Sequence, residues 1–194
     1  MRRVKNPAAR TLLILALSLA PVGPVFGQSL AELEERRGDL DSLLADLAKP
    51  DLRTWEATED KIVGLWSRSG SETADLLLQR GRDALEEEDY ATAIEHLTAL
   101  TDHAPDFAEG WHTRATAFYM MDEYGLALAD LERTLVLNPR HFAALTGMGI
   151  VLEELGNHEL ALAAMRLAHA LNPHRDNIND AIKRLEYRLG EATL

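Results

Sequence analysis

The sequence predicts an all-α solenoid: three repeats of two antiparallel helices, with helical caps at both ends. The first observation is an internal period, because Pro105, Pro139 and Pro173 are separated by 34 residues and then by 34 again, a period typical of helix-pair repeats. The second is that each period holds two stretches with the apolar spacing of amphipathic helices. The third is composition: of 194 residues, 46% are hydrophobic and 27% are charged, which is ordinary for a globular protein.

Composition also excludes several classes of function. The chain has no cysteine, which excludes a disulfide framework, a thiolate metal site and a cysteine nucleophile. The formal net charge is −12, and a surface that neutralises nucleic-acid phosphates needs clustered lysine and arginine instead. We therefore expect no nucleic-acid partner.

Residues 1–27 have the three parts of a secretory signal peptide. Four of the first ten residues are basic, and an apolar run follows over Leu12–Ala20. Val25 and Gly27 are the small residues before a cleavage point. The run is about half the length of a membrane-spanning helix. Cleavage predicts secretion across the inner membrane and, in a two-membraned bacterium, a periplasmic location; an uncleaved anchor and a fortuitous apolar start are the alternatives.

Cleavage would make the remaining chain more acidic. The first 27 residues carry four basic and no acidic side chains, so 16 basic and 32 acidic residues would remain. We expect such a chain to be repelled by anionic lipid surfaces and not to insert into a membrane once the signal is removed.

Residues 28–71 predict a pair of helices, over Leu30–Lys49 and Leu52–Ser67, separated by Pro50. The first has a leucine face, and the second has an apolar face that includes Trp55 and Trp66. We interpret the pair as a degenerate fourth unit that caps the N-terminal side of the repeats. The alternative is a leucine-rich helix that mediates dimerisation.

The prolines set three units, 74–107, 108–141 and 142–175, and other positions then align. The equivalent residues fall into four columns: small at the eighth position (Gly81, Ala115, Gly149), alanine at the twentieth (Ala93, Ala127, Ala161), large at the fourth (Leu77, Trp111, Leu145) and a ring at the seventeenth (Tyr90, Tyr124, His158). Small residues allow two helices to approach closely. Each proline ends its unit, because it lacks an N–H and disfavours helix in the preceding residue.

These columns resemble the tetratricopeptide repeat. The resemblance implies a right-handed α-α superhelix and a protein-binding role without catalysis. One departure is the seventh position, where Arg114 replaces the usual apolar residue. Arg114 would pair with Asp130 on the facing helix or be solvated. Residues 176–190 then predict a C-terminal capping helix, with Ile178, Ile182 and Leu185 on its apolar face.

No catalytic or metal-binding motif emerges from the sequence. Of the seven histidines, His158 opens like a zinc-protease motif, but Leu162 stands where its second histidine would be. His169 and His174 have a loose ligand spacing but straddle a repeat boundary, and there is no Gly-x-Ser-x-Gly elbow or phosphate-binding glycine loop. The acidic run Glu86–Asp89 is interpreted as a solvated corner. We therefore expect no cofactor, no resident metal and no enzymatic activity.

The resemblance places a partner-binding groove on the first helix of each unit. Its candidate residues combine apolar side chains with groups that would hold a carboxylate or a carbonyl: Leu78, Arg82, His112, Thr116, Tyr119, Met120, Thr146 and Ile150. The alternative is that these residues only tile a groove covered by the N-terminal helices. One subgroup of the family holds acidic chaperone tails in a polar clamp, but Leu78, Thr113, Ala143 and Gly147 stand at the clamp positions, so we expect no such tail to bind.

Two functional hypotheses remain. The first is an exported adaptor, monomeric by itself, whose groove captures a segment of another protein. The second is a structural subunit that self-associates through its N-terminal helices and has no external groove ligand.

Overall fold

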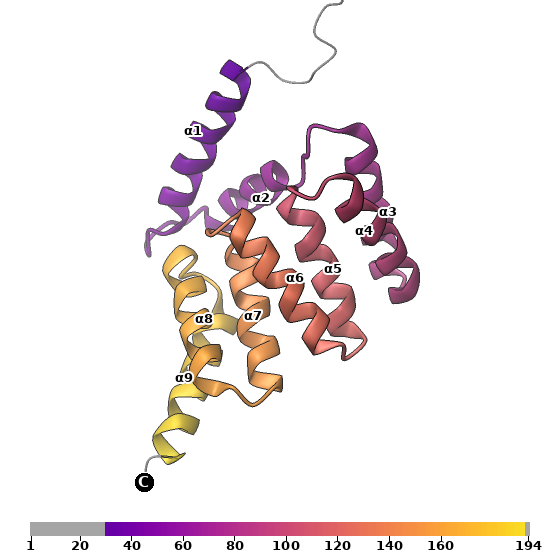
Figure 1. Ribbon diagram of the computed structural model, residues 1–194. Coiled ribbons are helices and arrows are strands. Elements are labelled where there is room, and N and C mark those ends of the chain that lie inside the picture. The colour runs from indigo at the N-terminus through magenta and orange to yellow at the C-terminus, as the bar shows by residue number, and fades with distance from the viewer. Residues whose placement is uncertain (1–29, 193–194) are drawn as a thin grey trace, which may run out of the picture.

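The computed structural model describes residues 30–192, and within them every regular element is a helix (Figure 1). In chain order these are α1 (Leu30–Leu47), α2 (Trp55–Trp66), α3 (Glu72–Glu86), α4 (Tyr90–His103), α5 (Ala108–Met120), α6 (Tyr124–Leu137), α7 (Phe142–Glu154), α8 (His158–Leu171) and α9 (Asp176–Ala192). The predicted all-α solenoid is confirmed. The predicted signal peptide, residues 1–27, lies outside the described residues. None of the described helices is both long and apolar enough to span a bilayer.

Three helix pairs form the body of the molecule: α3 with α4, α5 with α6, and α7 with α8. Consecutive pairs stack, because α5 packs on α4 and α7 on α6, and α9 then packs on α8. The column of small residues explains the closeness within a pair. A Cβ added at Gly81 would lie 2.5 Å from Leu97 Cγ, and one at Gly149 would lie 2.8 Å from Met165 Cε.

The turn inside each pair has the same backbone conformation. Glu88 and Asp122 have φ of 59°, and Gly156, at the equivalent position of the third pair, has φ of 76°. Glycine adopts this left-handed conformation without the steric cost that other residues meet. The next residue caps the second helix in two of the pairs, where the Asp89 and Asn157 side chains accept a hydrogen bond from a backbone N–H of α4 and α8.

The predicted pairing of Arg114 with Asp130 is present inside the second helix pair. Arg114 donates to both carboxylate oxygens of Asp130, at 2.7 and 2.9 Å, and also to the hydroxyl of Thr101 at 2.8 Å. The two charged side chains are only 13% and 6% exposed. This ion pair is therefore largely buried, and it is held in place by bidentate geometry.

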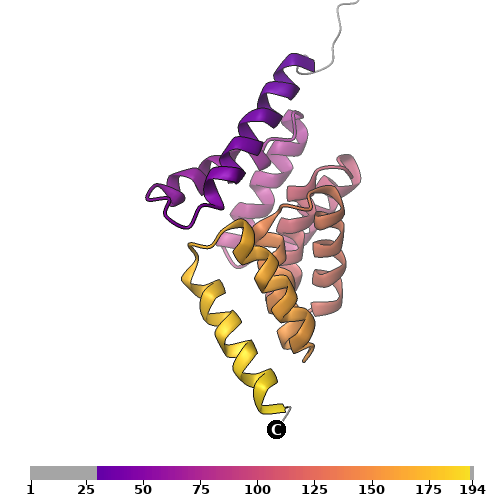
Figure 2. The same ribbon diagram turned by 90° about the vertical axis from the view of Figure 1, so that its left-hand side faces the viewer.

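The N-terminal pair of helices lies elsewhere than the sequence predicts. Instead of stacking ahead of the first repeat, α1 and α2 form a hairpin whose buried leucines and Ile62 pack against Phe142 at the start of α7 and Leu171 at the end of α8. Figure 2 shows α1 extending away from the stacked pairs. The apolar face of the hairpin thus packs on the third repeat.

Candidate functional site

A cavity of about 310 Å³ lies between α5, α7 and the start of α9. We call it the groove cavity, and its lining residues are Glu59, His112, Ala115, Thr116, Tyr119, Leu131, Phe142, Ala143, Thr146, Gly147, Ile150, Val151, Arg175, Asn177 and Ile178. Because α5 and α7 are the first helices of their pairs, this is the face on which the sequence predicts a groove. Glu59 belongs to α2, so the hairpin closes one end of the cavity.

The walls of the groove cavity are mostly apolar. Tyr119 and Ile150 are half-buried, and the Tyr119 ring packs against that of Tyr124 with centroids 5.8 Å apart. The hydroxyls of Thr116 and Thr146 donate to carbonyls of their own helices, at 3.3 and 2.9 Å. Their hydrogen atoms are therefore already used, and the walls favour an apolar side chain over a strongly polar one.

An ion pair with a buried carboxylate and a half-exposed arginine holds the closed end of the cavity. Glu59 of α2 is 6% exposed and accepts hydrogen bonds from the guanidinium of Arg175 through both of its oxygens. The side-chain amide of Asn172 donates to it at 2.7 Å. The hydrogen bond to Glu59 raises the pKa of Arg175 above its ordinary value. These contacts tie the hairpin to the loop between α8 and α9.

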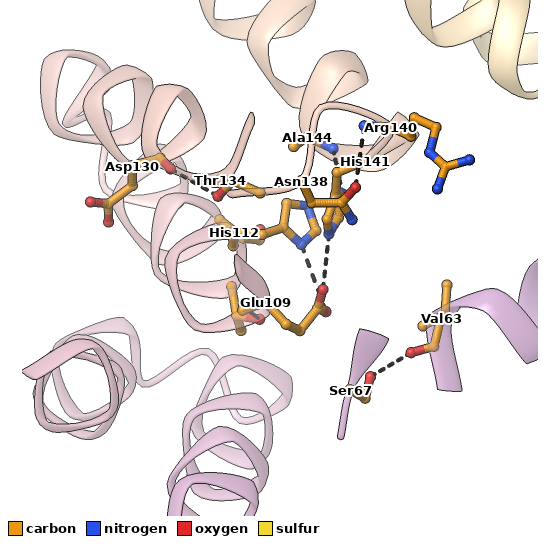
Figure 3. A network of polar contacts seen from close by, with 12 residues as sticks. Val63, Ser67, Glu109, His112, Asp130, Thr134, Asn138, Arg140, His141 and Ala144 are labelled. Atoms are coloured by element: carbon orange, nitrogen blue, oxygen red, sulfur yellow. Dashed lines mark hydrogen bonds and ion pairs between the residues drawn. The ribbon is translucent and has the colours of Figure 1, made fainter. Parts of the chain in front are cut away.

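A second buried carboxylate, Glu109, lies beside the cavity, where it faces His112 and His141 (Figure 3). Glu109, at the start of α5, is 5% exposed and accepts hydrogen bonds from Arg82 of α3 and from His141 Nε2, the latter at 3.0 Å. Arg82 also donates to the Ser67 hydroxyl at the end of α2, at 3.1 Å. The network Ser67–Arg82–Glu109–His141 therefore connects the hairpin to all three repeats.

The geometry assigns the tautomer of His141. Its Nδ1 accepts a hydrogen bond from the backbone N–H of Ala144 at 3.1 Å and so caps α7. The proton of the neutral ring is then on Nε2, which donates it to Glu109. Burial is the main cause that lowers the pKa of His141. Burial alone would raise the pKa of Glu109, but His112 and His141 outweigh it, and the net pKa is below its ordinary value.

Glu109, His112 and His141 also bring three possible metal ligands within 4.8 Å of one another. The chemistry of the donors does not fit a metal ion. His141 Nε2 would have to release its proton while Nδ1 gained one, and the hydrogen bond that caps α7 would be lost. Arg82 already neutralises Glu109 and would repel a cation. The arrangement therefore acts as a hydrogen-bond network.

Five of the eight predicted groove residues line the cavity, and they are His112, Thr116, Tyr119, Thr146 and Ile150. The other three lie elsewhere. Leu78 is 2% exposed and packs in the core with Ala74 and Leu97, Arg82 belongs to the Glu109 network, and Met120 is 52% exposed outside the cavity. Leu78 therefore contributes to packing and offers no surface to a partner.

Three residues in or beside the cavity were missed by sequence reasoning: Glu59, His141 and Arg175. Glu59 lies in a segment without a repeat period, so nothing in the sequence relates it to Arg175, which is 116 residues away. His141 carried a weak signal, because it directly precedes the apolar start of a predicted helix, where a capping residue is expected.

The sequence model for the tetratricopeptide repeat matches residues 78–120 and 112–176, which is half of the chain. A TPR repeat-containing protein from Rhizobium etli is 33% identical over 173 residues, and the match covers 84% of this chain and 84% of that protein. The human protein SGT1 homolog is 33% identical over 94 residues, but the match covers 48% of this chain and only 26% of that protein.

Solved structures share the fold at lower identity. The first tetratricopeptide domain of Spaghetti (RPAP3), bound to an HSP90 peptide, superposes with a TM-score of 0.61 at 21% identity, covering 62% of this chain and 95% of that chain. The crystal structure of MamA superposes with a TM-score of 0.58 at 19% identity, covering 85% of this chain and 87% of that chain. The MamA match extends beyond the three repeats alone.

Proposed function

We propose that this chain, which belongs to the tetratricopeptide repeat family, is a non-enzymatic scaffold that holds a segment of a partner protein in the groove cavity. The observation that carries this proposal is the cavity of about 310 Å³ on the face formed by α5 and α7. Five residues that the family resemblance assigns to a groove line it together. A cavity of this size suits one or two apolar side chains of a partner.

The chemistry of the cavity sets the kind of segment that it would hold. Spaghetti (RPAP3) carries an HSP90 peptide in its solved structure, but this chain has no polar clamp for an acidic tail. Leu78 and Thr113 are buried, and Ala143 and Gly147 line the cavity without any donor group on their side chains. An apolar anchor residue is therefore the better match.

We propose further that the chain is exported and acts in the periplasm. The support is the basic start, the short apolar run and the small residues before position 28. N-terminal sequencing of the protein purified from its cell tests this directly. An N-terminus at Gln28 is the expected result, and an intact Met1 in the soluble cell interior would contradict it.

The alternative, self-association through the N-terminal helices, has less apolar surface available to it. Leu44, Leu47 and Ile62 are buried against the third repeat of the same chain. We therefore propose a monomer. The mass of the purified protein in solution tests this proposal, because a stable dimer without partner would favour the structural alternative.

Site-specific photo-crosslinking in the native cell tests the groove. A photo-reactive residue would replace Tyr119, and the matched control would carry it at Glu132, an exposed position on the outer helix α6. We expect one dominant product with another protein from position 119 only. Identical products from both positions, or only self-crosslinks, would overturn the proposal.

A further inference from the structure

The turns inside the three helix pairs lie along one edge of the molecule (Figure 1). We call residues 86–89, 120–126 and 153–160 the turn edge. They align because consecutive repeats stack with the same geometry. The turn edge is distinct from the groove cavity, since none of its residues lines that cavity.

The turn edge exposes large apolar side chains. Five of them are about half exposed: Met120 (52%), Met121 (46%), Leu126 (50%), Leu155 (51%) and Leu160 (55%). Leu126 and Leu160 occupy equivalent repeat positions, as do Met121 and Leu155, so the second and third turns present the same apolar pattern. A monomeric protein rarely exposes such groups together unless they contact a partner.

A hollow adjoins the third turn at the end of this edge. Its volume is about 500 Å³, and its lining includes Leu155, His158 and Leu189. Among the described residues, His158 Nδ1 is one of the buried side-chain atoms without a hydrogen-bond partner. The lining is mixed, because Asn157 and Glu159 border the hollow together with the two leucines.

The charged residues of the turn edge itself are all acidic, and Arg188 of α9 lies beside its third turn, 3.5 Å from His158. Its acidic residues are Glu86, Glu87, Glu88, Asp89, Asp122, Glu123, Glu153, Glu154 and Glu159, and it contains no lysine or arginine. Of these, Glu153 is paired with Arg184. The carboxylates of neighbouring turns act on the same groups: the hydrogen bond to Asp122, with a smaller effect of Glu154 from the next turn, raises the pKa of Tyr124 to about 12.

We propose that the turn edge docks a cationic amphipathic helix of a partner protein, with lysine or arginine on one side of the helix and bulky apolar residues on the other. The apolar side chains of that segment would cover Met121, Leu155 and Leu160, and its cations would face the carboxylates. An anionic membrane, a nucleic acid or an acidic peptide would be repelled by the same edge. Together with the proposed function of the groove cavity, this proposal gives the chain two separate docking surfaces: a mostly apolar cavity, and an edge that combines apolar and acidic side chains.

Titration of the purified mature chain with a synthetic 18-residue helical peptide of lysine and leucine tests this proposal, read by calorimetry at 150 mM salt. A peptide of equal charge with serine in place of leucine is the control ligand. We expect the triple change Met121→Ser, Leu155→Ser, Leu160→Ser to weaken binding of the leucine peptide at least tenfold. The neutralised variant Asp122→Asn, Glu123→Gln, Glu154→Gln should weaken it similarly.

A matched control variant, Val136→Ser with Leu167→Ser, removes apolar side chains that are 71% and 58% exposed on the second helices of their pairs. It should bind as the unchanged protein does, and so should Tyr119→Ala in the groove cavity. Equal affinity for the leucine and serine peptides would overturn the proposal, because attraction would then be charge alone. A change of molecular mass in the turn-edge variants would also overturn it, because it would identify a contact between copies.

Discussion

The repeat array, α3 to α8, and the N-terminal hairpin, α1 and α2, are held in place by different kinds of contact. Inside the array, small residues face large apolar ones at equivalent positions, as with Gly81 against Leu97 and Gly149 against Met165. The hairpin has one small apolar cluster, around Ile62 and Phe142. Polar and aromatic contacts add to this cluster.

These polar and aromatic contacts involve both helices of the hairpin. Glu59 binds Arg175, Trp66 stacks on His141 with ring centroids 4.4 Å apart, and His174 Nε2 lies 3.0 Å from the carbonyl of Leu47. Apolar stacking makes each repeat stabilise its neighbours. A unit that joins the rest of a molecule through one apolar cluster and a few polar contacts opens at lower free energy than the rest. We therefore expect the hairpin to respond to charge and pH, and the array to respond to packing.

The largest effect is expected for Asp130→Ala in the array. It leaves the guanidinium of Arg114, 13% exposed, without its carboxylate. Removing one partner of a buried pair typically costs about 3–5 kcal/mol of unfolding free energy. Because the hydroxyl of Thr101 still accepts from Arg114, we expect the lower end of that range, measured by urea denaturation.

Asp180→Ala is the matched control for that change. Asp180 forms an ion pair with Lys183 in α9, and both side chains are more than two-thirds exposed. Exposed pairs contribute about 0–1 kcal/mol, so we expect almost no change. Similar losses in the two variants would mean that burial does not distinguish these ion pairs.

A smaller and local effect is expected for Glu59→Gln. The change removes the charge that Arg175 and Asn172 face, and hydrogen bonds to a charged group contribute about 1.5–3 kcal/mol. Hydrogen exchange should show faster exchange of backbone amides in α2, with the amides of α5 to α8 unchanged. Glu56→Gln, an exposed position of the same helix, is the control. Loss of protection throughout the chain would contradict the separation of hairpin and array.

The difference between the contacts of the array and those of the hairpin also explains which parts of the structure the sequence could predict. The array was predictable because its packing repeats every 34 residues, so each column is observed three times. Arg114 and Asp130 were assigned to each other on that frame. The hairpin has no repeat, and Glu59 meets Arg175 across 116 residues. The groove residues near the middle of α5 and α7 were assigned from their positions in the repeat. Leu78 occupies an equivalent position in the first repeat, but there the side chain is buried in the core.

The next prediction, in order of expected effect, compares two substitutions within the array, Gly81→Ala and Gly149→Ala. The new Cβ at position 81 would overlap the branched Cγ of Leu97, whereas at position 149 it meets the flexible side chain of Met165. Alanine gains about 1 kcal/mol over glycine in a helix, and overpacking costs about 1–3 kcal/mol. We expect Gly81→Ala to lower thermal stability and Gly149→Ala to leave it nearly unchanged. The reverse order would show that side-chain flexibility does not decide the cost.

The smallest effect is expected from pH, at the junction of hairpin and array. Burial lowers the pKa of His141, so the folded state favours the neutral ring. The unfolded ring takes up a proton near pH 6.5, and the unfolded state then binds more protons than the folded one. The stability that the neutral ring contributes is therefore complete above about pH 6.5 and is lost as pH falls toward the lowered pKa. The lowered pKa of Glu109 adds a further loss only below about pH 4.5.

His141→Asn isolates this contribution. Asparagine is a good capping residue, so it would still accept from Ala144 N–H, but it does not titrate. The variant should be less stable than the unchanged protein at pH 7.5, because the contact with Glu109 is lost. Between pH 7.5 and 5.5, however, urea denaturation should show a smaller fall in stability for the variant. Equal falls would mean that the other histidines, and not the buried ring beside Trp66, make this junction sensitive to acid.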